Sequence, residues 1–218
     1  MLDDLYKPFT FTNCFLEDLI SISVSIERLQ PMKVASYHSY NGNIVLKNSR
    51  QEQDILISKA WGNLVRWQMS YEYQKQFGNI KKLPATLMLG KFMIDNNLHL
   101  PPNTRYFGFI NPFPLNDYEF GYEAWAMLTN ISESVIAETQ NRNIIIKDYE
   151  GGLYITTEAT YGPDSNLDKV WKSLHYWLMQ NQQYDYGEHQ WLEEHITKSG
   201  EGGFHSFKLF LPIQPIGN

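Results

Sequence analysis

Two glutamates stand out because each lies in a short stretch of aromatic and apolar residues. Glu123 occurs in Gly-Tyr-Glu-Ala-Trp at residues 121–125, and Glu193 occurs in Gln-Trp-Leu-Glu at residues 190–193. Removing a carboxylate from water is costly unless a cation or a hydrogen-bond donor compensates for it. Such a carboxylate favours binding of a cationic ligand. The alternative is a rim position, or a structural pair with a nearby Arg or Lys.

Aromatic side chains are numerous enough to form a binding surface around these glutamates. The chain has 14 tyrosines, 12 phenylalanines and six tryptophans among 218 residues, more than a core alone usually needs. Rings that face a cation contribute about 0.5–2 kcal/mol each, although any one ring could equally pack in the core. The predicted ligand-binding residues are Glu193, Glu123, Trp125, Tyr122, Trp191, Tyr37, Tyr154 and Tyr106.

Other site chemistries find little support in the spacing of residues. His189, Glu193 and His195 resemble a metal-binding set, but alternate residues of a strand lie about 7 Å apart, too far for compact chelation. Cys14 is the lone cysteine, so an internal disulfide and a Cys-based metal site are both excluded. The glycine-rich residues 200–203 lack the strand and helix of a phosphate-binding loop. We therefore expect no metal and no cofactor.

The elements that must position the glutamates follow from a pattern that occurs twice. The spacing W-x-x-L-x-x-W appears at residues 61–67 and again at residues 171–177. A stripe at helical spacing is usually core, so these tryptophans are expected to hold a helix against a sheet. Around each helix the same order recurs, with two strands before it and two after it. Glu123 and Glu193 fall on the strands after the helices, and we interpret them as counterparts.

Apolar periodicity and turn residues predict the boundaries of these elements. The predicted strands cover residues 19–27, 32–40, 105–111, 118–129, 143–149, 153–160, 189–196 and 204–213. The predicted helices cover residues 52–73 and about 167–180, and Asp164, Ser165 or Asn166 could cap the second. Residues 79–103 are expected to be a long insertion, because Pro and Gly interrupt their apolar runs.

The fold class that follows is α+β. Two βαββ repeats are expected to pair about a pseudo-twofold axis, because neither repeat can bury a sheet face alone. The antiparallel sheets would carry both helices on one side, with a ligand cleft at the axis. After a lead-in at residues 1–19, residues 20–218 would form one domain. Its repeats would cover about residues 20–129 and 143–214.

Charge and hydropathy restrict the partners. The net charge is −6 and the sequence pI is about 5.5, whereas a nucleic-acid-binding domain usually shows a basic face. No apolar run approaches the roughly 18 residues of a membrane-spanning helix, and the first residues lack a signal-peptide pattern. We expect a cytoplasmic protein with a small-molecule ligand, without direct nucleic-acid or membrane binding, and with a possible protein partner or homodimer.

Four segments together resemble the GyrI-like or AraC-type effector-binding domain of bacterial transcription regulators. They are residues 105–112 with 118–125, 151–162, 171–178 with 189–194, and 209–213, and the likeness extends over about residues 20–214. The resemblance implies two βαββ units around a cleft for small, often cationic or aromatic molecules. It also implies that a buried glutamate, here Glu193, contacts the ligand. This chain has His195 where the family usually has tyrosine. Only about 20 residues precede the first predicted strand, so we expect no helix-turn-helix here.

The leading hypothesis is therefore a domain that binds an amphipathic, cationic or aromatic small molecule, as transcription-effector sensors do. Two alternatives stay open. A hydrolase would use Glu193 or Glu123 as general base on a water, with Tyr37 or Tyr154 as hydrogen-bond donors. A protein-interaction inhibitor would dock a DNA-handling enzyme through its acidic surface and the insertion at 79–103. Binding without catalysis is the preferred interpretation.

Overall fold

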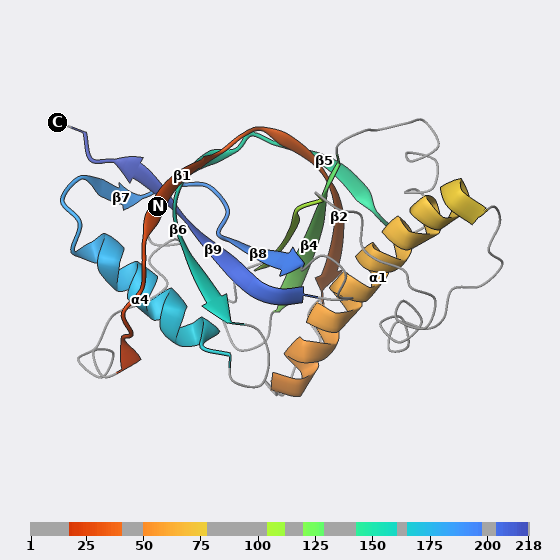
Figure 1. Cartoon of the computed structure of the whole chain (residues 1–218), viewed down its shortest axis with the longest axis horizontal. Coiled ribbons are helices and arrows are strands. Elements are labelled where there is room, and N and C mark those ends of the chain that lie inside the picture. The colour runs from red at the N-terminus through yellow and green to blue at the C-terminus, as the bar shows by residue number, and fades with distance from the viewer. Residues whose placement is uncertain are drawn as a thin grey trace.

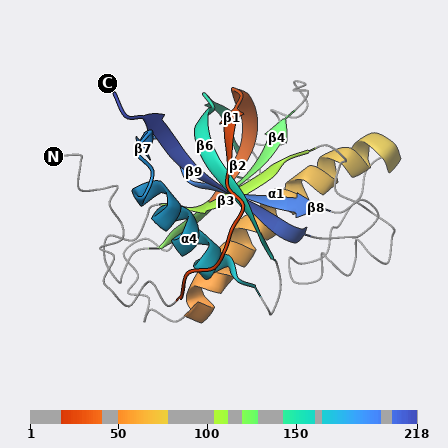
Figure 2. The same cartoon turned by 60° about the vertical axis from the view of Figure 1, so that its left-hand side comes forward.

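The chain forms nine strands and two helices within the residues that the computed structural model describes, and Figures 1 and 2 together label them. Those residues are 18–40, 50–77, 104–111, 120–128, 143–160, 165–197 and 204–217. The helices are α1 (Arg50–Phe77) and α4 (Leu167–Met179). The strands are β1 (Ser25–Leu29), β2 (Met32–Tyr40), β3 (Tyr106–Ile110), β4 (Gly121–Leu128), β5 (Ile145–Tyr149), β6 (Gly152–Thr160), β7 (Tyr184–Tyr186), β8 (Leu192–Thr197) and β9 (Phe204–Pro215).

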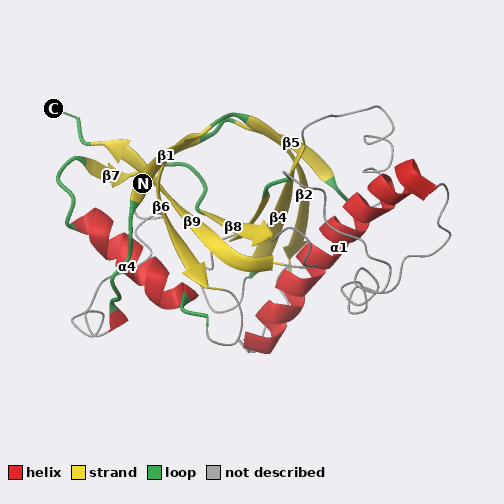
Figure 3. Cartoon of the chain, viewed as in Figure 1, coloured by secondary structure: helices red, strands yellow, loops and turns green. Residues whose placement is uncertain are grey.

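The strands form one antiparallel sheet whose order is symmetric. It runs β1-β6-β9-β8-β3-β4-β2-β5, with β7 attached to β9. The order is unchanged when β1, β6, β9 and β8 exchange places with β5, β2, β4 and β3. A pseudo-twofold axis therefore passes between β8 and β3. The prediction of an α+β fold built from two βαββ repeats is confirmed, and Figure 3 shows both helices on one side of the sheet.

The sheet curls because each strand at its edge continues directly into a strand near the opposite edge. β1 leads directly into β2, and β5 leads directly into β6. These two continuous segments lie side by side, since β1 pairs with β6 and β2 pairs with β5, and they bend at the same place (Figures 1 and 2). At the bend Gly151 has φ of 80°, and a Cβ there would lie 2.2 Å from the Leu29 carbonyl oxygen. Only glycine fits both the backbone angle and the space.

Alternation along the strands directs buried side chains to two faces. On the helix side, Leu64 and Trp67 of α1 pack on one half of the sheet, and Leu174 and Leu178 of α4 pack on the other. A third cluster fills the inside of the curl. It consists of Leu29, Val34, Phe107, Phe109, Trp125, Tyr154, Leu192 and Phe210. Neither helix contains, in its described part, an apolar stretch long enough to cross a membrane.

The start of the first strand differs from the prediction. Strand pairing begins at Ser25, whereas the alternating pattern predicted it from residue 19. Ile20, Ile22 and Val24 instead pack against the cluster beneath α4, and the Ile20 N–H donates to Ser173 Oγ at 2.9 Å. The alternation therefore reflects burial against a helix rather than pairing with a strand. β7 was not predicted, because its three residues lie in the connection between the predicted helix, which ends near residue 180, and the predicted strand at 189–196.

Of the residues predicted to cap the second helix, Ser165 accepts a hydrogen bond from the first-turn Leu167 N–H at 3.4 Å through its hydroxyl. Asn166 occupies the N-cap position of α4, but its side chain makes no capping hydrogen bond. Its Oδ1 accepts hydrogen bonds from the Thr160 N–H at 3.1 Å and the Thr160 hydroxyl at 3.0 Å. The residue therefore fastens the end of β6 to the start of α4. The predicted insertion at 79–103 lies outside the described residues.

Candidate functional site

Glu193 lies on the helix side of β8, at the centre of the sheet. Its carboxylate accepts a hydrogen bond from the Trp171 indole N–H at 3.0 Å, and Trp171 belongs to α4. No described Lys or Arg forms an ion pair with Glu193. The residue keeps some exposed surface, but burial of the carboxylate raises its pKa to about 7, against the hydrogen bond from Trp171, which lowers it. A carboxylate in this state lacks a positive partner.

Rings from the first repeat border Glu193 across the strand pair. Its direct partner on β3 is Gly108, and a Cβ at Gly108 would lie 2.1 Å from the Tyr122 hydroxyl and 2.8 Å from the Trp61 ring. Side chains directly opposite each other have Cβ atoms about 4.5–5.5 Å apart. Tyr122 and Trp61 therefore occupy the space beside Glu193 that a side chain at Gly108 would fill. His195, two residues along β8, packs against Trp61 with ring centres 4.2 Å apart and planes 52° apart.

Rings from the second repeat complete the surroundings. Trp171 stacks on Trp191 with ring centres 5.9 Å apart and planes 27° apart, and His175 lies 4.6 Å from Trp191. Burial lowers the pKa of His175 to about 4 and that of His195 to about 3, so both rings are neutral near pH 7. We use the name interhelical cluster for the group around Glu193. It consists of Trp61, Tyr122, Trp171, Trp191, Glu193 and His195.

Glu123 lies on the opposite face of the sheet and is fully compensated. Burial opposes its ionisation, but hydrogen bonds from Lys147, Ser36, Trp125 and Asn111 outweigh that effect and hold its pKa below the ordinary value. The Trp125 indole donates to one carboxylate oxygen at 2.6 Å, and the Asn111 amide donates to the other at 2.7 Å. Glu123 lies inside the curl and is surrounded by these donors, so it forms a structural ion pair with Lys147. The structure does not bring the two glutamates together.

The two glutamates are not counterparts in the repeat, which corrects the expectation from sequence. Strands β2 and β6 correspond with a shift of 120 positions, as Met32 and Gly152 show. His38 pairs with Glu123 on one side, and Glu158 pairs with Lys208 on the other. The counterpart of Glu123 is therefore Lys208. The same comparison carried to β3 and β8 makes Gly108 the counterpart of Glu193.

Comparison with known protein families identifies the family of this chain. The family described as integron-associated effector binding protein, Cass2, matches residues 66–213, which is more than half of the chain. The chain belongs to the Cass2 family. Its resemblance to GyrI-like effector-binding domains is thereby confirmed, and as a member it is a small-molecule-binding domain. No curated protein matches it in sequence.

The chain is similar to several solved structures, and the EcmrR structures show the same fold at low sequence identity. The crystal structure of the EcmrR C-terminal domain is 12% identical, covers 90% of this chain and 100% of that chain, and has a TM-score of 0.53. EcmrR in a cryo-EM complex with DNA is 12% identical, with 92% and 60% covered and a TM-score of 0.50. The integron cassette protein VCH_CASS2 of Vibrio cholerae is 13% identical, with 88% and 95% covered and a TM-score of 0.42.

The other residues predicted to line the ligand site fall into two groups in this Cass2-family chain. Tyr37 and Tyr106 face the helix side and pack in the cluster beneath α1, where the Tyr106 hydroxyl donates to Gln68 Oε1 at 2.8 Å. Trp125 and Tyr154 lie inside the curl with Glu123. The structure thus gathers Glu193, Tyr122 and Trp191 in the interhelical cluster and places Trp125, Tyr154 and Glu123 on the other face.

Three members of the interhelical cluster were not predicted to line the ligand site. Trp61 and Trp171 were assigned to the core because they lie in helical stripes, yet both side chains keep part of their surface exposed. Two features of the sequence could have indicated these residues. Trp61 and Trp171 are the first tryptophans of the two repeated motifs. His195 lies two residues after Glu193, and residues two apart on a strand share a face.

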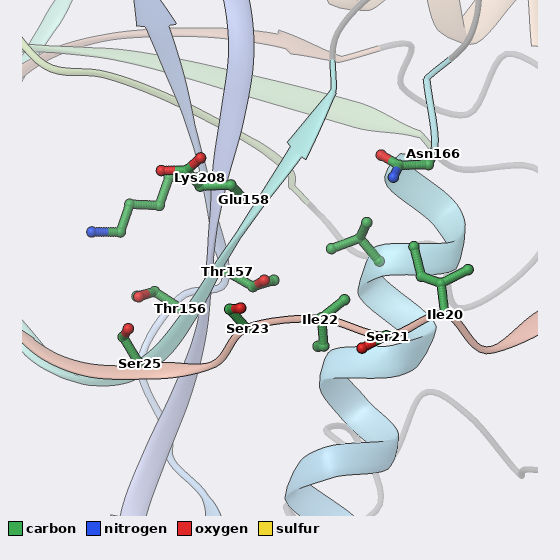
Figure 4. Close-up of a pocket in the computed structure, with 11 residues that line it drawn as sticks. Ile20, Ser21, Ile22, Ser23, Ser25, Thr156, Thr157, Glu158, Asn166 and Lys208 are labelled. Carbon is green, nitrogen blue, oxygen red and sulfur yellow. The ribbon is translucent and has the colours of Figure 1, made fainter.

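Two hollows in the described part of the chain lie away from this cluster. One, of about 420 Å³, opens between residues 20–25, β6 and the start of α4, and Figure 4 shows the hydroxyl groups that line it, including Ser23 and Thr157. The second, of about 460 Å³, lies beside Trp177. Neither contains a predicted ligand-binding residue.

Proposed function

We propose that this Cass2-family chain binds a monovalent organic cation with aromatic or apolar groups, and that Glu193 contacts its charge. The observation that carries the proposal is the contrast among three buried or partly buried glutamates. Glu194 pairs with Arg105 through two hydrogen bonds of 2.6 and 2.8 Å, and Glu123 pairs with Lys147. Among the residues that the structure describes, Glu193 has only the neutral indole of Trp171 as a partner. A ligand cation would supply the charge that these residues do not.

The rings around Glu193 suit the apolar part of such a ligand. Trp171 and Trp191 present stacked indoles on one side, and Trp61 with His195 presents rings on the other. A cation over an indole face gains about 0.5–2 kcal/mol, and more when water is excluded. Because both histidines are neutral, the cluster contributes no positive charge that would repel the ligand.

Cytoplasmic location and a role in transcription regulation stay predictions from sequence.

Calorimetric titration with tetraphenylphosphonium tests the proposal, with tetraphenylborate as a probe of matching shape and opposite charge. At pH 8 we expect the phosphonium to bind and the borate not to bind. Glu193→Gln keeps the shape of the side chain and removes its charge, so affinity should fall about tenfold or more, which corresponds to at least about 1.4 kcal/mol. Equal affinity of the wild-type chain for both probes would contradict a carboxylate site.

A matched control separates the local effect of Glu193 from the overall negative charge. Glu188→Gln removes an exposed carboxylate five positions upstream and should leave the affinity unchanged. Glu193→Gln should fold well, because burial disfavours the charged form that the substitution removes. If both variants lose affinity equally, the attraction is nonspecific and the proposal fails.

A further inference from the structure

The Glu193 carboxylate already accepts a hydrogen bond from a side chain of the protein itself. The Trp171 indole N–H donates to it at 3.0 Å, and neighbouring rings pack against that indole. Trp171 stacks on Trp191, and its ring centre lies 6.0 Å from His175 one turn along α4. His175 is itself fixed, because its Nδ1 and the Tyr186 hydroxyl form a hydrogen bond of 3.0 Å. The contact between Trp171 and Glu193 therefore belongs to a continuous packed group.

The counterpart position in the first repeat lacks this arrangement. Trp61 corresponds to Trp171 in the repeated motif, and Gly108 corresponds to Glu193. Without a side chain at Gly108, the Trp61 ring packs over the strand and against His195 and Tyr122. The pairing of an indole donor with a central carboxylate thus occurs on one side of the pseudo-twofold axis only. It is a feature of this site rather than a requirement of the helix packing.

We propose that Trp171 is an internal competitor for the ligand, whose N–H holds the Glu193 carboxylate until a cation displaces it. The inference rests on the proposed function, because it concerns the same carboxylate. A neutral ligand that offers one N–H or O–H only replaces one neutral donor by another and gains little. A cation adds the attraction between opposite charges, which is stronger in a site with little water. Trp171 therefore acts as a specificity-determining residue that favours charged ligands over neutral donors.

The displacement needs only a local movement. The Trp171 side chain keeps part of its surface exposed, whereas Val170 and Leu174 hold α4 against the sheet with almost none. We therefore expect the indole to rotate away from Glu193 while the helix stays in place. Its ring then remains available to the ligand as a stacking surface.

Substitution of Trp171 by Phe tests the competitor directly, because Phe keeps a ring for stacking and lacks the N–H. Affinity for tetraphenylphosphonium is measured by calorimetry at pH 9, well above the pKa of about 7 of Glu193 in the wild-type chain. Removing a competing hydrogen bond worth about 0.5–1.5 kcal/mol should tighten binding roughly two- to tenfold. Trp177→Phe, the same change on the same helix beside a separate hollow, should leave affinity unchanged.

The outcomes separate this inference from the proposed function. Binding by the wild-type chain with equal or weaker binding by Trp171→Phe overturns the competitor and leaves the proposed function standing. If Trp171→Phe binds tetraphenylphosphonium and the wild-type chain does not, the inference that Trp171 competes with the ligand is supported. Binding by neither protein overturns both.

Indole N–H signals in a nuclear magnetic resonance spectrum provide a second readout on the wild-type chain, independent of whether Trp171→Phe folds. Saturation with tetraphenylphosphonium should shift the Trp171 signal in the same direction as Glu193→Gln does without ligand. An unmoved signal in a saturated protein contradicts displacement.

Discussion

At the scale of residues, the three glutamates on strands β4 and β8 differ because their surroundings differ. Glu194 and Arg105 form a two-hydrogen-bond pair, and the Arg105 guanidinium also lies 5.0 Å from the centre of the Phe107 ring. Glu123 accepts hydrogen bonds from four side chains. Glu193 accepts one from a neutral donor. Sequence alone indicated two glutamates in aromatic stretches, but not which of them carries a compensating cation.

Glu123→Gln should destabilise the fold while leaving ligand binding intact. The charged carboxylate holds Lys147, and its replacement by an amide weakens several charge-assisted hydrogen bonds at about 1.5–3 kcal/mol each, so we expect a loss of about 2–3 kcal/mol at pH 7. The pKa of Glu123 is lowered, so its stabilisation is present above its ordinary pKa of 4.5 and is lost as pH falls through the folded-state value.

Urea denaturation of wild type and Glu123→Gln at pH 7 and at acidic pH measures this effect. The difference between the two proteins should shrink at the lower pH. A variant as stable as wild type at pH 7, or one that no longer binds tetraphenylphosphonium although folded, would contradict a purely structural role.

At the scale of elements, the pairing of β3 with β8 sets the environment of the site. Gly108 pairs with Glu193 and Phe107 pairs with Glu194, so the charged residues of β8 face a glycine and a phenylalanine. The helices supply the remaining walls through Trp61 and Trp171. The helical spacing of the tryptophan motifs correctly predicted α1 and α4. It could not show that the first tryptophan of each motif lies at the rim, because rim and core positions share the same periodicity.

Gly108→Ala should disturb the site without changing the fold. The added Cβ would approach the Tyr122 hydroxyl to 2.1 Å and the Trp61 ring to 2.8 Å, so both side chains must move. Overpacking of this kind costs about 1–3 kcal/mol of stability. Thermal unfolding should show that loss, and calorimetry should show weaker binding of tetraphenylphosphonium. Unchanged affinity in the variant would show that Tyr122 and Trp61 do not border the ligand.

At the scale of the whole molecule, the pseudo-twofold axis relates two ion pairs of reversed polarity. Lys147 on β5 pairs with Glu123 on β4, and Glu27 on β1 pairs with Lys208 on β9. Strand registers make Lys147 the counterpart of Glu27 and Glu123 the counterpart of Lys208. Each pair joins an outer strand to an inner strand on the inside of the curl, across the strand between them. Together they fasten both ends of the curled sheet.

A double-mutant cycle on Glu27 and Lys208 measures one of these fastenings. Both side chains are about one-third exposed, so solvent screens the pair and the expected coupling is about 1 kcal/mol. Glu27→Gln and Lys208→Gln together should therefore cost less than the two single costs added. The free energies of unfolding come from urea titrations at low salt. Strict additivity would show that the pair contributes nothing.

The α+β class, the repeat and most elements followed from the sequence because alternation and helical stripes report local burial. Contacts between distant segments did not follow. Ile20, Ile22 and Val24 alternate like a strand but bury against α4, and Glu123 and Glu193 appear equivalent along the chain yet lie on opposite faces of the sheet. The placement of the two glutamates is decided by the order of the strands. That order depends on the pairing of β3 with β8, which the spacing of residues in the sequence does not encode.

Proton release on binding tests the central claim, that the Glu193 carboxylate takes up the charge of a cation, most directly. With a pKa of about 7, Glu193 is mostly protonated at pH 6, and a bound cation must drive that proton off. Calorimetric titration of tetraphenylphosphonium at pH 6, in buffers of different ionisation enthalpy, counts the protons. We predict release of roughly 0.9 proton per ligand from wild type and none from Glu193→Gln. Binding to wild type without proton release would contradict the account.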